Sequence, residues 1–140
     1  MTTVALTSQS LGIAGVLLIT IVTIETGGYY LTRVARGAVA LTDFQKAFAR
    51  AGHAHAGVFV ILSLVALPYA DAAGAHGFWG WLARTAIPIT AILMPAGFFF
   101  SSMGQGRTKP NALVALIWIG AVFLAAGVLT LGILVLQAAA

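Results

Sequence analysis

The stretch that decides the fold is "NALVALIWIGAVFLAAGVLTLGILVLQ", residues 111–137, which contains no charged residue. A helix rises about 1.5 Å per residue, so about 20 apolar residues cross the hydrocarbon core of a bilayer. No water is available there to satisfy an open backbone, and the alternating pattern of a membrane β-strand is absent. We therefore predict a transmembrane α-helix.

Three other apolar stretches have the same character, and the chain as a whole is predicted to be an all-α, four-helix membrane bundle. The expected spans are residues 11–31, 52–70, 81–102 and 111–137. The composition agrees, because 61% of the 140 residues are hydrophobic and 7% are charged, whereas soluble domains average about 25% charged residues. Residues 1–140 are expected to form one domain. The absence of cysteine excludes disulfides and thiolate metal sites.

Basic residues predict the orientation of this bundle. Four lie between the first two spans and two between the last two spans, namely Arg33, Arg36, Lys46, Arg50, Arg107 and Lys109. The opposite side carries only Arg84. The positive-inside rule then predicts that both termini lie outside and that these two loops lie on the cytoplasmic side of a bacterial inner membrane. The net charge of +4 is interpreted as contact with anionic lipid headgroups, not with nucleic acid.

The helix ends carry signals of their own. In "LTDFQKAF", Thr42 and Gln45 have the spacing of a capping box, so the second helix is expected to begin near Asp43. Trp79 and Trp81 are typical of an interfacial aromatic belt on the outer side.

Two segments half a chain apart also resemble each other, namely "GYYLTRVARG" at 28–37 and "GFFFSSMGQG" at 97–106. They suggest a duplicated two-helix hairpin, whose copies would be related in parallel by an axis along the membrane normal.

Ionisable residues inside the spans indicate a candidate site, because such groups are costly in a membrane. The motif "RAGHAHAG", residues 50–57, places His53 and His55 just past Arg50. Glu25 lies eight residues before Arg33, so it is about 12 Å below the same surface, and His55 is about 7.5 Å below it. Consecutive antiparallel helices normally pack together. We therefore expect Glu25 to contact one of the two histidines.

Other polar groups fall at the same level and complete a predicted polar pocket near the cytoplasmic face. They are Tyr29, Ser101, Gln105 and Asn111. The outer half of the bundle is expected to be apolar. Residues two apart on a helix point about 200° apart, so the two histidines should have different neighbours. The alternative is that both histidines are polar interface residues satisfied by carboxylate, serine or water.

Several functions fit such a pocket. The favoured one is a binding or accessory protein that holds a small ligand or a lipid headgroup, working as a homo-oligomer or with other membrane subunits. A haem b or metal-dependent redox protein using His53 and His55 is the main alternative, although H-x-H on a helix is poor geometry for one ion. An intramembrane enzyme and a proton or small-solute pathway are further alternatives. No motif indicates a reaction, so a binding role is preferred over an enzyme.

Small residues spaced for close helix packing recur in the spans. The pairs are Gly52 and Ala56, Gly97 and Ser101, Ala121 and Ala125, and Gly120 and Gly127. They can serve either the bundle itself or an oligomer. The prolines Pro88 and Pro95 are expected to bend the third helix or to open a local gap in its backbone hydrogen bonds.

The segments "FARAGHAHAGVFVILSLV" and "ILMPAGFFFSS" resemble those of a group of small bacterial, mostly actinobacterial, four-span membrane proteins. The likeness covers nearly the whole chain, and "RAGHAHAG" is its most specific part. It implies the four-span fold and no activity. A second likeness, limited to Gly52 and His53, is to four-span proteins of the hydroxylaminobenzene mutase type.

Overall fold

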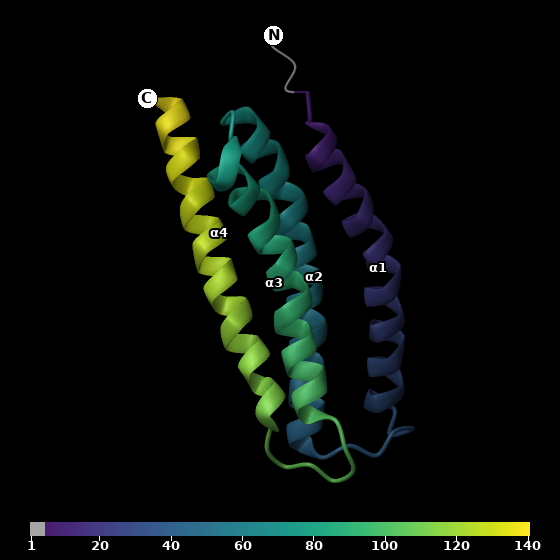
Figure 1. The fold of residues 1–140 in the computed structure, drawn as a ribbon. Coiled ribbons are helices and arrows are strands. Elements are labelled where there is room, and N and C mark those ends of the chain that lie inside the picture. Colours follow the sequence, from purple (N-terminus) through teal and green to yellow (C-terminus); the bar gives the residue numbers. More distant parts are fainter. Residues whose placement is uncertain (1–4) are drawn as a thin grey trace.

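The computed structural model describes residues 5–140 as four long α-helices that run side by side (Figure 1). The helices are α1 (Ser8–Ala35), α2 (Asp43–Ala72), α3 (Gly77–Ser102) and α4 (Ala115–Ala139), and a 3₁₀ turn, η1 (Ala112–Val114), precedes α4. Each is long and apolar enough to cross a membrane, α4 being taken together with η1. The predicted all-α bundle of four candidate spans is confirmed.

Local capping explains where two of these helices begin. The Thr42 hydroxyl accepts from the Gln45 backbone N–H at 3.2 Å, and the Gln45 side chain accepts from the Thr42 N–H at 3.2 Å. This reciprocal pair is the predicted capping box, and α2 begins at Asp43 as expected. At the start of η1, the Asn111 side chain accepts from the Leu113 N–H at 2.8 Å.

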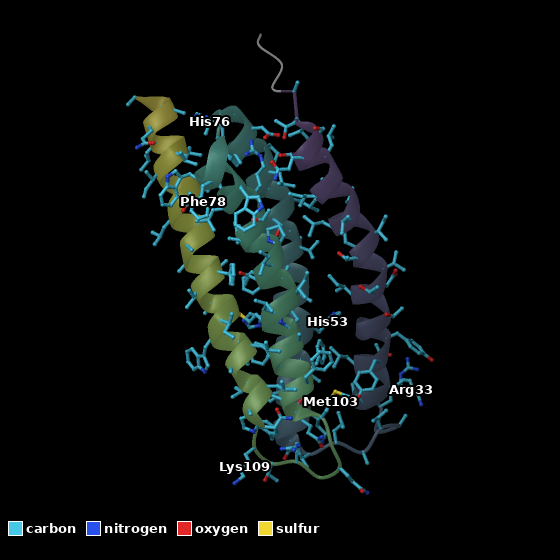
Figure 2. All side chains as sticks on the ribbon, in the orientation of Figure 1. Arg33, His53, His76, Phe78, Met103 and Lys109 are labelled. Carbon is cyan, nitrogen blue, oxygen red and sulfur yellow. The ribbon has the colours of Figure 1, made fainter. Side chains whose placement is uncertain are left out.

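The bundle has two chemically different ends. The start of α1 and the end of α4 lie at one end, with the short α2–α3 connection, and we call this the terminal end (Figure 1). The α1–α2 and α3–α4 connections lie at the other end, the loop end, where Figure 2 shows Arg33 and Lys109. Six of the seven Lys and Arg residues belong to the loop end.

Helices α2 and α3 form the centre, α4 packs against α3, and α1 packs against α2 (Figure 1). The α3–α4 interface is close because glycines line it. A Cβ built at Gly97 would lie 2.7 Å from Ile117 Cγ1, and one at Gly127 would lie 2.8 Å from Ala86 Cβ. The Thr90 hydroxyl also donates to the Gly120 carbonyl at 3.0 Å. These small residues therefore serve the packing of the chain itself.

Helix α1 is held much more loosely. Only Ser10, Leu17 and Val34 of its residues are buried. Leu17 joins an apolar cluster with Val60 and Leu67 of α2. The α1–α2 hairpin is thus packed more loosely than the α3–α4 hairpin. The proposed duplication stays a prediction from the sequence.

Candidate functional site

The two histidines of the "RAGHAHAG" motif have different neighbours, as their spacing predicts. His53 lies against α1 (Figure 2), where a Cβ at Gly27 would be 3.4 Å from His53 Nδ1 and one at Gly28 would be 3.3 Å from Cε1. His55 instead packs on α3, with its ring centroid 4.9 Å from that of Phe98. Its Nδ1 donates to the Ala51 carbonyl at 2.7 Å. Each imidazole is therefore part of a separate helix contact.

Glu25 does not take part in either contact. Its side chain is exposed, and within residues 5–140 the ion pairs shorter than 4 Å are Lys46–Asp43 and Arg84–Asp71. Glu25 also makes no side-chain hydrogen bond in this part of the chain. The expected contact between Glu25 and a histidine is therefore not formed. On α1 it is the backbone at Gly27 and Gly28 that approaches His53, while the Glu25 side chain is exposed.

The other predicted polar residues do not gather around these histidines. Tyr29 is 69% exposed and Gln105 is also exposed. Ser101 is buried, and its carbonyl accepts from the Asn111 N–H at 2.9 Å, while Asn111 Nδ2 donates to the Phe100 carbonyl at 3.0 Å. Ser101 and Asn111 therefore stabilise the turn between α3 and η1.

The buried Gln45 side chain links two helices, a role that its capping-box spacing does not indicate. Its Nε2 donates to the Ser102 carbonyl at 2.9 Å and to the Gly104 carbonyl at 2.7 Å. The capping residue thus also fastens the start of α2 to the end of α3.

The terminal end holds the most polar buried group of the described chain, so the prediction of an apolar outer half was wrong. Arg84 Nη2 lies 2.6 Å from Asp71 Oδ1, and their side chains are 5% and 1% exposed. Arg84 Nη1 donates to the Ala75 carbonyl at 2.8 Å and to the Gly80 carbonyl at 3.1 Å. The guanidinium is therefore both neutralised and hydrogen bonded.

The same group extends to α1. Arg84 Nε donates to the Ser10 hydroxyl at 3.2 Å, and the Thr7 N–H donates to Asp71 Oδ2 at 2.9 Å. We call Thr7, Ser10, Asp71 and Arg84 the terminal polar network. It joins three helices. The available signal was an arginine inside a predicted apolar span, with an aspartate at the end of the preceding helix, but Arg84 was counted only as a topological charge.

Between this network and the His53 contact lies a lateral groove of about 600 Å³, bounded by α1 on one side and by α2 and α3 on the other. We call it the α1–α3 groove. Its walls include Val16, Leu17, Ile24, Val60, Pro88 and Ile92.

The three threonines of these walls do not make the groove polar. The hydroxyls of Thr20, Thr23 and Thr85 donate to carbonyls of their own helices at 2.7, 2.6 and 2.8 Å. Their donor capacity is used, so the groove presents an apolar surface to a ligand.

A polar hollow of about 330 Å³ adjoins the groove at the terminal end. Its lining includes Ser8, Gln9, His76 and Arg84, and it shares Trp81 with the α1–α3 groove. Asp71 pairs with Arg84, so this hollow offers hydroxyl, amide and imidazole groups beside an arginine that already has its countercharge. Groove and hollow together have one apolar and one polar part, like an amphiphile.

Metal or haem ligation was the main alternative role for the histidines. In residues 5–140, no group of three or more His, Cys, Asp or Glu residues is placed to hold a metal ion. His53 and His55 belong to different helix contacts, and His76 lies at the terminal end (Figure 2). Comparison of the chain with protein-family models, with curated proteins and with solved structures finds no match.

Proposed function

We propose that the protein is an integral membrane binding protein that holds one amphiphilic molecule, a single-chain lipid with an uncharged headgroup. The carrying observation is that the α1–α3 groove, of about 600 Å³, and the polar hollow share Trp81 in their walls. This volume falls in the range of about 300–1,000 Å³ that is usual for ligand sites. The sequence favours a binding role over an enzyme, and we retain that role. We now propose the binding site in the terminal half of the bundle, whereas the sequence suggested the loop end.

The chemistry of the two parts supports this choice of ligand. The groove walls are apolar at the depth of the spans, so an alkyl or isoprenyl chain fits them without a desolvation penalty. The hollow is lined by Trp81, which is 45% exposed, as is common for tryptophan at the headgroup level of a membrane. A phosphate or carboxylate headgroup finds no unpaired arginine there, because Arg84 is already paired with Asp71.

The groove can be tested by filling it. Gly12 lines it and a Cβ there meets nothing within 4 Å, so Gly12→Trp is expected to fit and to occupy ligand space. The readout is photo-crosslinking of a diazirine-bearing monoacylglycerol in vesicles. We expect labelling to fall by about tenfold, which corresponds to about 1.4 kcal/mol of lost binding.

Gly15→Trp is the matched control for this experiment. Gly15 lies on the same helix and is equally open, but it is not part of the groove lining. Its labelling should stay at the level of the unmodified chain. Equal labelling of both variants, or crosslinked residues that lie outside α1, α2 and α3, would contradict the proposal.

In the proposed orientation, the loop end lies on the cytoplasmic side of a bacterial inner membrane. The positive-inside rule supports it, because six of seven Lys and Arg residues lie at the loop end and the seventh is paired with Asp71. The polar hollow would then open toward the outer leaflet. Assembly into a homo-oligomer or a larger complex stays a prediction, as does membership of the four-span group that shares "RAGHAHAG".

Orientation has a clean test because the chain contains no cysteine. Single cysteines are introduced as Ala138→Cys at the terminal end and Thr108→Cys at the loop end, and intact cells are treated with a membrane-impermeant maleimide. We expect labelling of the first and protection of the second until the cells are lysed. The opposite pattern would reverse the proposed orientation.

A further inference from the structure

A second hollow, of about 440 Å³, lies at the loop end between the last turns of α1 and the first turns of α2. It is lined by Leu31, Thr32, Val34, Ala35, Lys46 and Arg50, and we call it the basic pocket. We propose that the basic pocket binds the phosphate-bearing headgroup of an anionic phospholipid from the leaflet at the loop end. This inference is independent of the ligand proposed for the α1–α3 groove, because the two sites share no residue.

Charge is the first argument. Lys46 Nζ lies 3.2 Å from Asp43, but the Asp43 side chain is fully exposed, so solvent weakens that pair. Arg50 is exposed, its Nε donates to the Lys46 carbonyl at 3.3 Å, and none of the described carboxylates lies within 4 Å of it. The pocket therefore presents two cations against a single screened carboxylate. An anion is the complementary ligand.

The position of the pocket is the second argument, and it favours a lipid over a soluble phosphate. Lys46 and Arg50 precede the apolar stretch of α2, while Leu31 and Val34 supply an apolar wall on α1. In a bilayer this places the cations at headgroup depth and the apolar wall beside the start of an acyl chain. Basic pockets between helices on the cytoplasmic side are a common form of anionic lipid site.

The surroundings reinforce this preference. Arg33 and Arg36 are exposed at the end of α1, and Arg107 and Lys109 lie in the other connection at the same end. Asp43 is the only acidic residue of the two connections and the helix ends that meet there. The loop end therefore attracts anionic lipid in general, and the basic pocket adds a defined place for one headgroup.

The test compares two ways of removing the same charge. The double variant Lys46→Gln and Arg50→Gln removes two cations from the pocket, and Arg107→Gln with Lys109→Gln removes two from the other loop. The full chain is placed in nanodiscs of phosphatidylcholine with a minor fraction of phosphatidylglycerol, and lipids retained on the protein are counted by native mass spectrometry. We expect retained phosphatidylglycerol to fall about tenfold in the first variant and less than about twofold in the second.

A third variant protects the test against misfolding. Thr32→Trp keeps both cations but fills the basic pocket from an exposed position of α1. It too should lose phosphatidylglycerol, while groove labelling by the monoacylglycerol probe is retained. Equal losses in the two double variants, or unchanged retention in Thr32→Trp, would overturn the proposal. Displacement of the lipid by inorganic phosphate would show a soluble-anion site in its place.

Discussion

Replacing Arg84 with methionine is expected to lower the free energy of unfolding by about 3–5 kcal/mol, because it leaves a buried carboxylate without its countercharge. The Asp71 side chain is 1% exposed, and its Oδ1 lies 2.6 Å from Arg84 Nη2. Arg84 also donates to the Ala75 and Gly80 carbonyls and to the Ser10 hydroxyl. One substitution therefore breaks contacts to α1, α2 and the α2–α3 connection. Unfolding by sodium dodecyl sulfate, followed by circular dichroism, measures the change.

Two control variants separate the loss of the ion pair from other causes. Asp71→Leu combined with Arg84→Met removes both charges together and should recover much of the stability, since no lone charge stays buried. Asp43→Asn breaks the exposed pair with Lys46 and should cost less than about 1 kcal/mol. If Arg84→Met costs no more than Asp43→Asn, the terminal polar network does not stabilise the bundle.

Arg84→Met alone is also expected to loosen α1 selectively, because α1 makes few contacts with the other helices. Leu17 is 6% exposed where α1 packs on α2. A cysteine at this position should react slowly with a membrane-permeant maleimide in the parent chain and faster with Arg84→Met. Reaction at a similarly buried position of the α3–α4 interface, Met94→Cys, should change less, since the terminal polar network includes no residue of α4.

Gly97→Ala is expected to destabilise the bundle by about 1–3 kcal/mol through overpacking. Its new Cβ would lie 2.7 Å from Ile117 Cγ1 and 2.8 Å from the Ile117 backbone N. A side chain could rotate away, but a backbone atom cannot, so α4 has to move. Because α4 packs mainly on α3, the displacement should weaken the attachment of the whole helix. The same detergent titration measures the effect.

Gly132→Ala is the matched control, and its expected effect has the opposite sign. Gly132 lies in α4, and a Cβ there meets nothing within 4 Å. Alanine is favoured over glycine inside a helix by up to about 1 kcal/mol, so stability should stay the same or rise slightly. If both variants destabilise equally, the cost comes from the helix backbone and not from the α3–α4 contact.

Helix α1 is attached to the other helices at separate places along its length. It is joined to the other helices by the terminal polar network at one end and by the His53 contact with Gly27 and Gly28 further along. The α1–α3 groove lies between these two attachments. Between these attachments Leu17 packs with Val60 and Leu67 of α2, so α1 is held at a third place along the groove.

Much of the fold follows from the sequence because its signals are local. Runs of about 20 apolar residues predict the spans, and the Thr42 and Gln45 capping box predicts the start of α2 at Asp43. The spacing of His53 and His55 predicts different neighbours, and the structure confirms this. Each of these inferences needs only residues a few positions apart on one helix.

Which polar groups meet was decided by the tertiary structure. Arg84 contacts Ser10, 74 residues away in the sequence, and Thr7 contacts Asp71, 64 residues away. Such contacts depend on how each helix is rotated about its axis, and apolar residues that surround a membrane helix leave that rotation undetermined. Close approach at glycines accompanies the rotation seen here: Gly27 and Gly28 lie against His53, and Gly97 and Gly127 lie at the α3–α4 contact. Sequence therefore determined the helices, and packing determined the site between them.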